Sequence, residues 1–109
     1  MRVAYRIWLD NDGKAFGEGP YRLLKGIEKT GSLRQAAAEQ GISYRKAWCV
    51  LRDIEKKLGF HILERQVGGV SGGGSVLTAS GKSLMKRYEL FRAEANKALE
   101  RIFRKHFRA

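Results

Sequence analysis

The segment "SLRQAAAEQGISYRKAWCVLRDIEKKLG" constrains the fold of this chain more than any other stretch. Ser32 is a helix-capping residue followed by an alanine-rich helical run, and Gly41 supplies the left-handed conformation that ends such a helix. Ser43 caps a third predicted helix, which extends to Leu58 and ends at Gly59. Two helices joined by so short a turn, "QGIS", predict a helix-turn-helix unit.

Residue sizes and spacings within this segment support the same interpretation. Ala36 and Ala37 lie where the two helices must approach closely, and Ile42 fills the corner between them. Within the helix predicted over residues 43–58, apolar residues recur at intervals of three and four and are predicted to face inward: Ala47, Val50, Leu51, Ile54 and Leu58. The opposite face carries Arg45, Cys49, Arg52 and Lys56.

The rest of the chain predicts short strands and two further helices around this unit. Residues 3–9, "VAYRIWL", indicate a strand, and the turn "DNDGK" indicates a hairpin closing on Ala15 and Phe16. Pro20 favours the first turn of a helix that ends near "KTG". "FHILERQV" and "SVLTA" predict two strands, and a last helix begins at Thr78 or Ser80 and reaches Phe107. We expect one α+β domain, mainly α, over residues 1–109.

The glycine-rich stretch "VGGVSGGGSVLTASGKS", residues 67–83, ends in Gly-Lys-Ser and therefore invites a comparison with nucleotide-binding loops. A phosphate-binding P-loop requires a glycine five residues before Gly81, and that position is Val76. The stretch also joins two predicted strands, whereas a P-loop leads directly from strand to helix. We therefore expect a hairpin wing whose small residues let backbone N–H groups approach phosphates of another molecule.

The charge of the chain points to a polyanionic partner. Twenty-two Lys and Arg against eleven Asp and Glu give a net charge of +11. The excess lies in residues 20–59 and 80–109. A single cysteine excludes an internal disulfide, and no apolar run reaches the roughly eighteen residues of a membrane span. The first residues do not resemble a signal peptide, so we expect a cytoplasmic protein that does not bind a membrane.

An α-helix fits the major groove of DNA, and its N-terminal residues meet the base edges. Arg45 is predicted to read guanine with its bidentate guanidinium, and Tyr44 offers a hydroxyl and a ring for a thymine methyl or a phosphate. Lys46 is predicted to contact phosphate, and Arg52 lies on the Arg45 side of the helix. The sequence leaves two roles open for Trp48, a half-buried core residue or a DNA contact. Cys49, on the outer face, is interpreted as a small neutral spacer rather than a redox switch.

The segments "GSLRQAAA", "GISYRKAW" and "LERQVGGVSGGGSVLTASGKSL" resemble the N-terminal DNA-binding domain of the molybdate-dependent ModE regulators and, more distantly, of LysR-type regulators. The resemblance covers nearly the whole chain. It implies a winged helix-turn-helix that dimerises through long helices and binds palindromic operators. It also implies a recognition helix over 43–58 and a wing over 67–75. ModE regulators continue into molybdate-binding domains, which we expect this chain to lack.

The last predicted helix carries an apolar seam with intervals of four and three, which is typical of a coiled-coil contact. The seam residues are predicted to form a homodimer interface: Leu84, Tyr88, Phe91, Ala95, Ala98 and Ile102. The first two turns of this helix are expected to pack on their own domain. A basic amphipathic helix lying on a membrane is the less favoured alternative for "RIFRKHFR", because the stretch is short.

These features predict a sequence-specific DNA-binding transcriptional regulator, and the alternative is an architectural protein that binds nucleic acid by charge alone. The residues expected to contact DNA come from both helices of the unit, the wing and the start of the last helix: Ser32, Arg34, Ser43, Tyr44, Arg45, Lys46, Trp48, Arg52, Arg65, Gly69, Ser71, Gly73 and Lys82. His61 and His106, the two histidines, suggest no catalytic arrangement. We expect no enzyme activity, no metal and no cofactor. The operator and any separate effector are not specified by the sequence.

Overall fold

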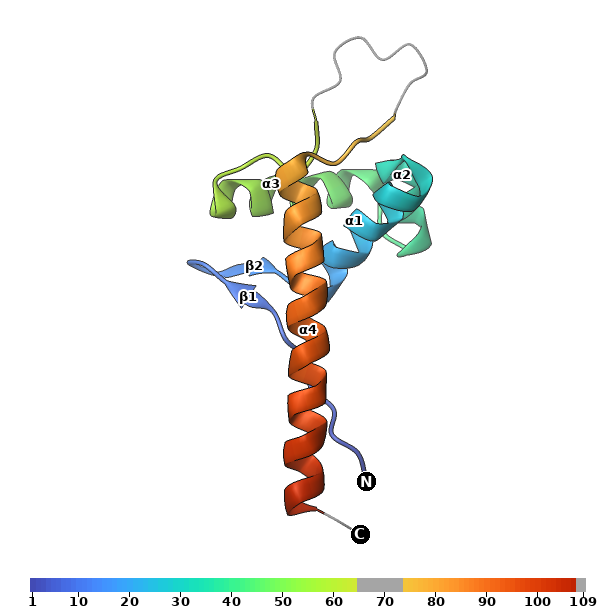
Figure 1. The fold of residues 1–109 in the computed structure, drawn as a ribbon. Helices are drawn as coiled ribbons and strands as arrows, with labels where there is room; N and C mark the ends of the chain where they lie inside the picture. The colour runs from blue at the N-terminus through green and yellow to red at the C-terminus, as the bar shows by residue number, and fades with distance from the viewer. Residues whose placement is uncertain (65–73, 108–109) are drawn as a thin grey trace.

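The computed structural model of the chain describes residues 1–64 and 74–107 (Figure 1). A small antiparallel hairpin, β1 (Leu9–Asp10) and β2 (Lys14–Phe16), precedes four helices. The helices are α1 (Glu18–Thr30), α2 (Leu33–Glu39), α3 (Tyr44–Leu58) and α4 (Ala79–His106). The first three helices gather around the upper part of α4, whose lower part projects away from them (Figure 1). The predicted α+β class, mainly α, is confirmed.

Capping side chains set the helix starts where the sequence predicts them. The Ser32 hydroxyl accepts a hydrogen bond from the backbone N–H of Gln35 at 3.1 Å, and Ser43 accepts one from Lys46 at 3.0 Å. Thr78 caps α4 by accepting from the Gly81 N–H at 2.9 Å, so Ser80 lies inside the helix. These bonds satisfy N–H groups that have no partner within a helix.

The hairpin is shorter than the sequence suggests. The predicted strand over residues 3–9 is wrong for residues 3–8, because only Leu9 and Asp10 pair with β2. Gly17 is already the N-cap of α1, so β2 is three residues long and offers no partner to residues 3–8. The Ile7 carbonyl instead accepts a hydrogen bond from the Tyr88 hydroxyl at 3.2 Å. The predicted closure of the hairpin on Ala15 and Phe16 is confirmed, since Leu9 pairs with Phe16.

The helix α2 packs on α1 through small residues. A Cβ added to Gly26 would lie 2.7 Å from the Cβ of Ala36 and 3.2 Å from its Cα. Ala36 and Ala37 are buried and Ile42 packs against the core at the turn, but the close approach of Ala36 is to Gly26 of α1, whereas the sequence predicted a close approach to α3. The predicted inward face of α3 is confirmed, because its apolar residues are buried or half-buried in the core: Ala47, Val50, Leu51, Ile54 and Leu58.

Between α3 and α4, the described residues contain one isolated antiparallel bridge, Leu63 with Leu77, in place of the two strands predicted from "FHILERQV" and "SVLTA". Glu64 donates its N–H to the Val76 carbonyl at 2.7 Å on one side of this bridge. Ser75 donates its N–H to the Gly31 carbonyl at 2.8 Å, which ties the returning chain to the start of α2. Residues 65–73, most of the predicted wing, lie outside the described residues.

The upper half of α4 is anchored on α1 and β2 by an aromatic and ionic contact. The Tyr88 ring meets Phe16 edge-on at 5.2 Å between centroids and lies 5.4 Å from the ring of Tyr21. Tyr21 donates its hydroxyl to Glu89 at 2.5 Å, and the Arg92 guanidinium donates to Glu18 at 2.6 Å. Burial first and the neighbouring Glu89 second raise the pKa of Tyr21 to about 12.

The α1–α2 contact predicts opposite effects for two glycines of the same helix. Gly26→Ala forces a methyl against Ala36 and should destabilise the fold by about 1–3 kcal/mol. Gly19→Ala is the matched control, because a Cβ there meets nothing within 4 Å. We expect it to be neutral or to stabilise α1 by up to about 1 kcal/mol. Urea unfolding of both variants measures the difference, and equal stabilities would refute the close-contact account.

The α1–α4 contact predicts a pKa change in Glu89. The Tyr21 hydroxyl first, and then Lys25 and Lys86, hold the pKa of Glu89 below its usual value. In Tyr21→Phe this pKa should rise toward that value, as measured by NMR titration of the side-chain carboxyl. A carboxyl with a lowered folded pKa contributes stability that is lost as the pH falls through that pKa. The stability difference between native protein and variant should therefore narrow on acidification.

Tyr5→Phe is the control for this titration, because Tyr5 is exposed and makes no side-chain hydrogen bond to the described residues. It should leave the Glu89 titration unchanged. An unchanged Glu89 pKa in Tyr21→Phe would show that the hydroxyl does not carry the effect.

Candidate nucleic-acid interface

The first turn of α3 presents polar and basic side chains outward. The Ser43 hydroxyl caps the helix. The first side chains that can reach another molecule are therefore those of Tyr44, Arg45 and Lys46. All three are exposed, and Tyr44 retains 37% of its accessible surface. Ala47 faces inward at 0% exposure and holds this turn against the core. The helix therefore offers its N-terminal end as a polar, basic edge.

Tyr44 is the centre of a group of side chains that we call the Tyr44 cluster: Arg34, Tyr44, Trp48 and Arg52. The Trp48 indole N–H donates to the Tyr44 hydroxyl oxygen at 2.6 Å, and the two rings meet edge-on with centroids 6.4 Å apart. The Arg34 guanidinium, from α2, lies 4.3 Å from the Tyr44 ring centroid. Arg52 lies 6.0 Å from the Trp48 ring. The cluster bridges both helices of the unit.

The structure places Trp48 between the two alternatives that the sequence leaves open. Its side chain is half-buried and packs against the core, while its indole nitrogen reaches the exposed Tyr44 hydroxyl. Sequence reasoning missed this bond and the Arg34 contact. The spacing of Tyr44 and Trp48, four residues apart on one helix, was the available signal for the first. No comparable signal marks the Arg34 contact, which depends on the crossing of α2 and α3.

The basic side chains of this edge have no acidic partner, a feature that they share with most Lys and Arg side chains of the described residues. Within residues 1–64 and 74–107, no carboxylate lies in salt-bridge range of the following side chains: Arg34, Arg45, Lys46, Arg52 and Lys82. Five Lys and Arg side chains of the described ranges are paired, among them Lys57 with Asp53 at 3.0 Å, and others away from α3 are unpaired, such as Arg87 and Arg101. An unpaired cation keeps its attraction for an external anion, so the cations of this edge are available to bind one.

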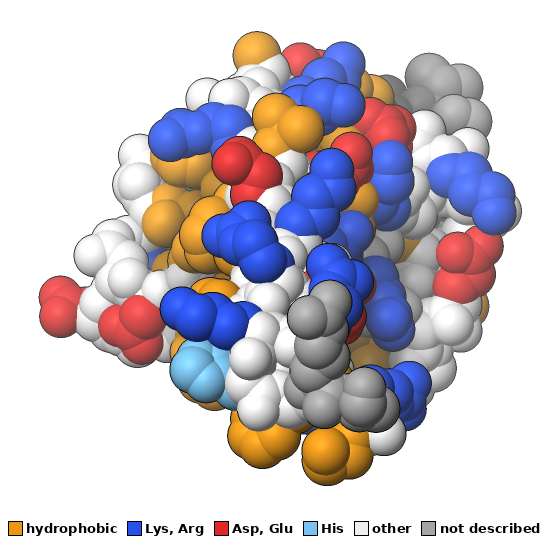
Figure 2. All heavy atoms as spheres, turned by 60° about the horizontal axis from the view of Figure 1, so that its bottom comes forward, with side chains coloured by type: hydrophobic (Ala, Val, Ile, Leu, Met, Phe, Trp, Pro, Cys, Tyr) orange, Lys and Arg blue, Asp and Glu red, His pale blue; other side chains and the backbone are white. Residues whose placement is uncertain are grey.

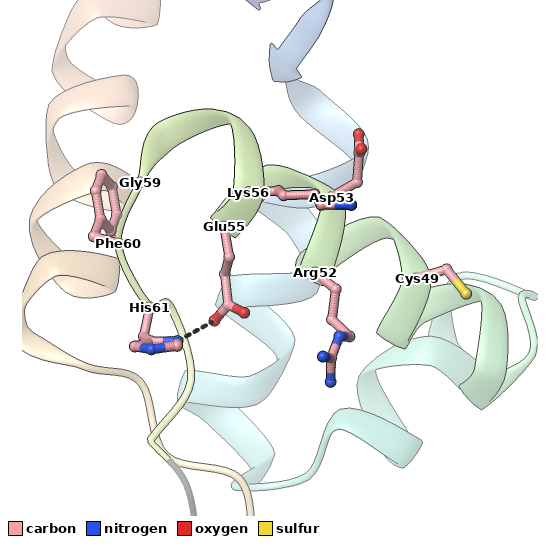
Figure 3. Close-up of a pocket in the computed structure, with 8 residues that line it drawn as sticks. All are labelled: Cys49, Arg52, Asp53, Glu55, Lys56, Gly59, Phe60 and His61. Atoms are coloured by element: carbon pink, nitrogen blue, oxygen red, sulfur yellow. Dashed lines mark ion pairs between the residues drawn. The ribbon is translucent and has the colours of Figure 1, made fainter.

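The C-terminal half of α3 forms a shallow pocket with the segment that follows it (Figure 3). Glu55 extends toward His61, and its carboxylate accepts hydrogen bonds from the N–H groups of Ile62 at 2.7 Å and Leu63 at 3.4 Å. His61 Nδ1 lies 3.8 Å from the same carboxylate. Glu55 therefore fixes the chain leaving α3. Cys49 and Arg52 lie at the other end of the pocket (Figure 3).

The remaining predicted DNA contacts divide between described and undescribed residues. Ser32 uses its hydroxyl to cap α2, and Lys82 is exposed in the first turn of α4. The predicted contacts within the wing lie outside the described residues: Arg65, Gly69, Ser71 and Gly73.

Basic side chains are not confined to α3. Figure 2, which brings the lower end of the molecule forward, shows Lys and Arg side chains across the middle of that face. Asp and Glu side chains lie at its left and right edges and also among the basic side chains in its upper part. The last turn of α4 contributes Arg104, Lys105 and His106. Charge alone therefore does not locate the binding edge, and the geometry of α3 has to do so.

The predicted seam on α4 changes character along its length. Tyr88 is 2% exposed and belongs to the core, and Leu84 packs against that core. Further down, Phe91 is 45% and Ile102 49% exposed, with the half-buried alanines 95 and 98 between them. The part of the seam that faces outward thus begins at Phe91.

Other kinds of site find little support in the described ranges. Among these residues no three His, Cys, Asp or Glu side chains group in a way that would hold a metal ion. None of the described helices combines the length and apolar character needed to cross a membrane.

Comparison with known proteins gives concordant matches. The model of the family "Bacterial regulatory helix-turn-helix protein, lysR family" matches residues 21–82. The DNA-binding transcriptional dual regulator ModE of Escherichia coli (strain K12) is 43% identical over 79 residues, which cover 72% of this chain and 30% of that protein. The molybdenum-pterin-binding protein MopB of Rhodobacter capsulatus is 35% identical over 98 residues, covering 90% of this chain and 36% of that protein. The chain thus spans about a third of these relatives.

Among solved structures, the CbnR_DBD–DNA complex matches with a TM-score of 0.60 and 21% identity, over 77% of this chain and 92% of that one. At this identity the match shows the fold alone. The predicted resemblance to ModE and LysR-type regulators is confirmed by these findings. From the family match over α1 to the start of α4, the chain belongs to the lysR family of bacterial regulatory helix-turn-helix proteins.

Proposed function

We propose that this chain is a sequence-specific DNA-binding transcriptional regulator that inserts the N-terminal end of α3 into the major groove. The observation that carries the proposal is the position of exposed cations, Arg45 and Lys46, in the first turn of the second helix of the helix-turn-helix. A helix fits the groove, and its first residues meet the base edges. The solved complex of CbnR_DBD, a domain with the same fold, with DNA supports the assignment.

The side chains of this edge divide by chemistry into base readers and phosphate contacts. Arg45 is exposed and has a planar fork that matches the O6 and N7 acceptors of guanine. Lys46, a compact point charge, suits a phosphate oxygen. Arg52 lies two turns further along α3 and suits the DNA backbone. Lys82, at the start of α4, is placed to do the same. The wing, residues 67–75, is proposed as a further phosphate contact.

The proposed regulator is a homodimer that binds a palindromic operator. A helix of 28 residues is about 42 Å long, and only its upper part packs on the domain. The outward seam from Phe91 to Ile102 leaves apolar surface exposed along the projecting part. Pairing two such helices buries this surface and presents two copies of α3 to successive major grooves, about 34 Å apart.

Base reading by Arg45 predicts a selective loss of affinity. Duplexes are first enriched from a random pool by binding to the native protein, and affinities are then measured for the enriched and a scrambled duplex. Arg45→Ala should weaken binding to the enriched duplex by about 1–3 kcal/mol more than to the scrambled one. Lys46→Ala should weaken both about equally and reduce the salt dependence by about one counterion.

Lys46→Ala therefore serves as the control for the loss of one charge. Equal losses on both duplexes for Arg45→Ala would contradict base reading by this residue. Failure of the native protein to enrich any sequence would favour the alternative, a binder that acts by charge alone.

If the seam is the dimer interface, a glutamate within it should abolish dimerisation, and a glutamate on the opposite side of α4 should not. Ala95→Glu places a charge in the proposed interface and should yield a monomer in sedimentation equilibrium. Ala93→Glu places the same charge on the exposed opposite side of α4 and should leave the dimer intact. Circular dichroism controls for helix content in both variants. A dimer that survives Ala95→Glu unchanged would place the interface elsewhere.

A further inference from the structure

The hydrogen bond within the Tyr44 cluster has a fixed direction. An indole nitrogen can only donate, so in the 2.6 Å contact the Tyr44 oxygen is the acceptor and Trp48 the donor. The Tyr44 hydroxyl hydrogen must then point to another group. No hydrogen bond within the described residues uses this hydrogen, and 37% of Tyr44 is exposed, so the hydroxyl is open to an acceptor on another molecule. A tyrosine hydroxyl can both donate and accept a hydrogen bond, and the contact with Trp48 leaves it as a donor toward other molecules.

The remaining contacts hold the Tyr44 ring in one orientation. The Arg34 guanidinium covers it at 4.3 Å from the centroid, and the Trp48 ring meets it edge-on. Trp48 is itself fixed, because its half-buried ring packs against the core. A tyrosine held by two neighbours loses little rotamer freedom when it binds, which favours a directional contact over a loose one.

We infer that Trp48 is a positioning residue for Tyr44, and that the Tyr44 hydroxyl donates to an acceptor on a base edge in the major groove. The inference rests on the proposed function and adds a specificity-determining pair to it. Guanine, adenine and thymine each present an acceptor in the major groove, whereas cytosine presents only its N4 amino donor. At the position that Tyr44 contacts, cytosine is therefore the disfavoured base on the contacted strand.

The test is a double-mutant cycle on the ratio between the affinities for the enriched duplex and for the scrambled duplex. Tyr44→Phe removes the hydroxyl, and Trp48→Phe removes the indole N–H while keeping an aromatic ring. Each should lower the ratio about three- to tenfold, the effect of one hydrogen bond. Combined, they should lower it no further than Tyr44→Phe alone, because Trp48 acts through that hydroxyl.

A base-preference readout separates positioning from a general structural effect. Repeating the selection with each variant should relax the preference at one base pair, the same for both, and remove the exclusion of cytosine there. Trp8→Phe is the matched control, since Trp8 is exposed and adjoins the hairpin. It should leave the ratio and every base preference unchanged. Unfolding midpoints show whether Trp48→Phe remains folded, and the ratio is compared only between folded variants.

Three results would overturn the inference. The first is an equal loss of both affinities in Tyr44→Phe, which would assign its hydroxyl to phosphate. The second is a double variant whose loss is the product of the two single losses, which would make Trp48 independent of Tyr44. The third is a relaxed preference at different base pairs in the two variants. In each of these cases the native protein still enriches a sequence, so the proposed function stands. If the native protein enriches no sequence, the proposed function and this inference fail together.

Discussion

The close approach of α1 and α2 at Gly26 is the contact on which the rest of the structure depends. With no side chain at this position, Ala36 sits against the α1 backbone, and the short turn then carries the chain directly into α3. The other side of α1 holds α4 through Tyr21, which reaches both Tyr88 and Glu89. One helix thus fixes both the proposed reading edge and the proposed dimer helix. A shift of α1 would displace both.

Ion pairs connect α1 with α4, and the cations at the start of α3 lie outside these pairs. Carboxylates at Glu18 and Glu89 bind cations of α1 and α4, where Arg92 joins the two helices. Exposed pairs of this kind add little stability each, so their main effect is to fix orientation. The α3 edge carries the opposite arrangement, cations without carboxylates. Unpaired cations also lie on the lower part of α4, such as Arg101 and Arg104, so charge and helix geometry together single out the α3 edge.

The sequence predicted correctly the features that depend on residues close together in the chain. It failed for features that depend on contacts between residues far apart in the chain. Ser32, Ser43 and Thr78 cap the helices because a cap needs only a hydroxyl and the next turn. The strand over residues 3–8 fails because strand formation requires a partner, and Gly17 ends β2 too early to supply one. In the candidate site, the outward residues of α3 followed from periodicity. The Arg34 contact with Tyr44 did not, since it depends on how two helices cross.

The contacts of Tyr44 with Trp48 and Arg34 make this exposed aromatic at the start of α3 compatible with a selective surface. An exposed tyrosine alone would sample several rotamers and both directions of hydrogen bonding. Here Trp48 ties its oxygen to the core, and Arg34 ties its ring to α2. The rigidity of the helix-turn-helix, set by Gly26 and the alanines opposite it, therefore extends to the side chains of its edge. In a complex with DNA, the position of the α3 backbone would therefore fix the position of the Tyr44 hydroxyl hydrogen.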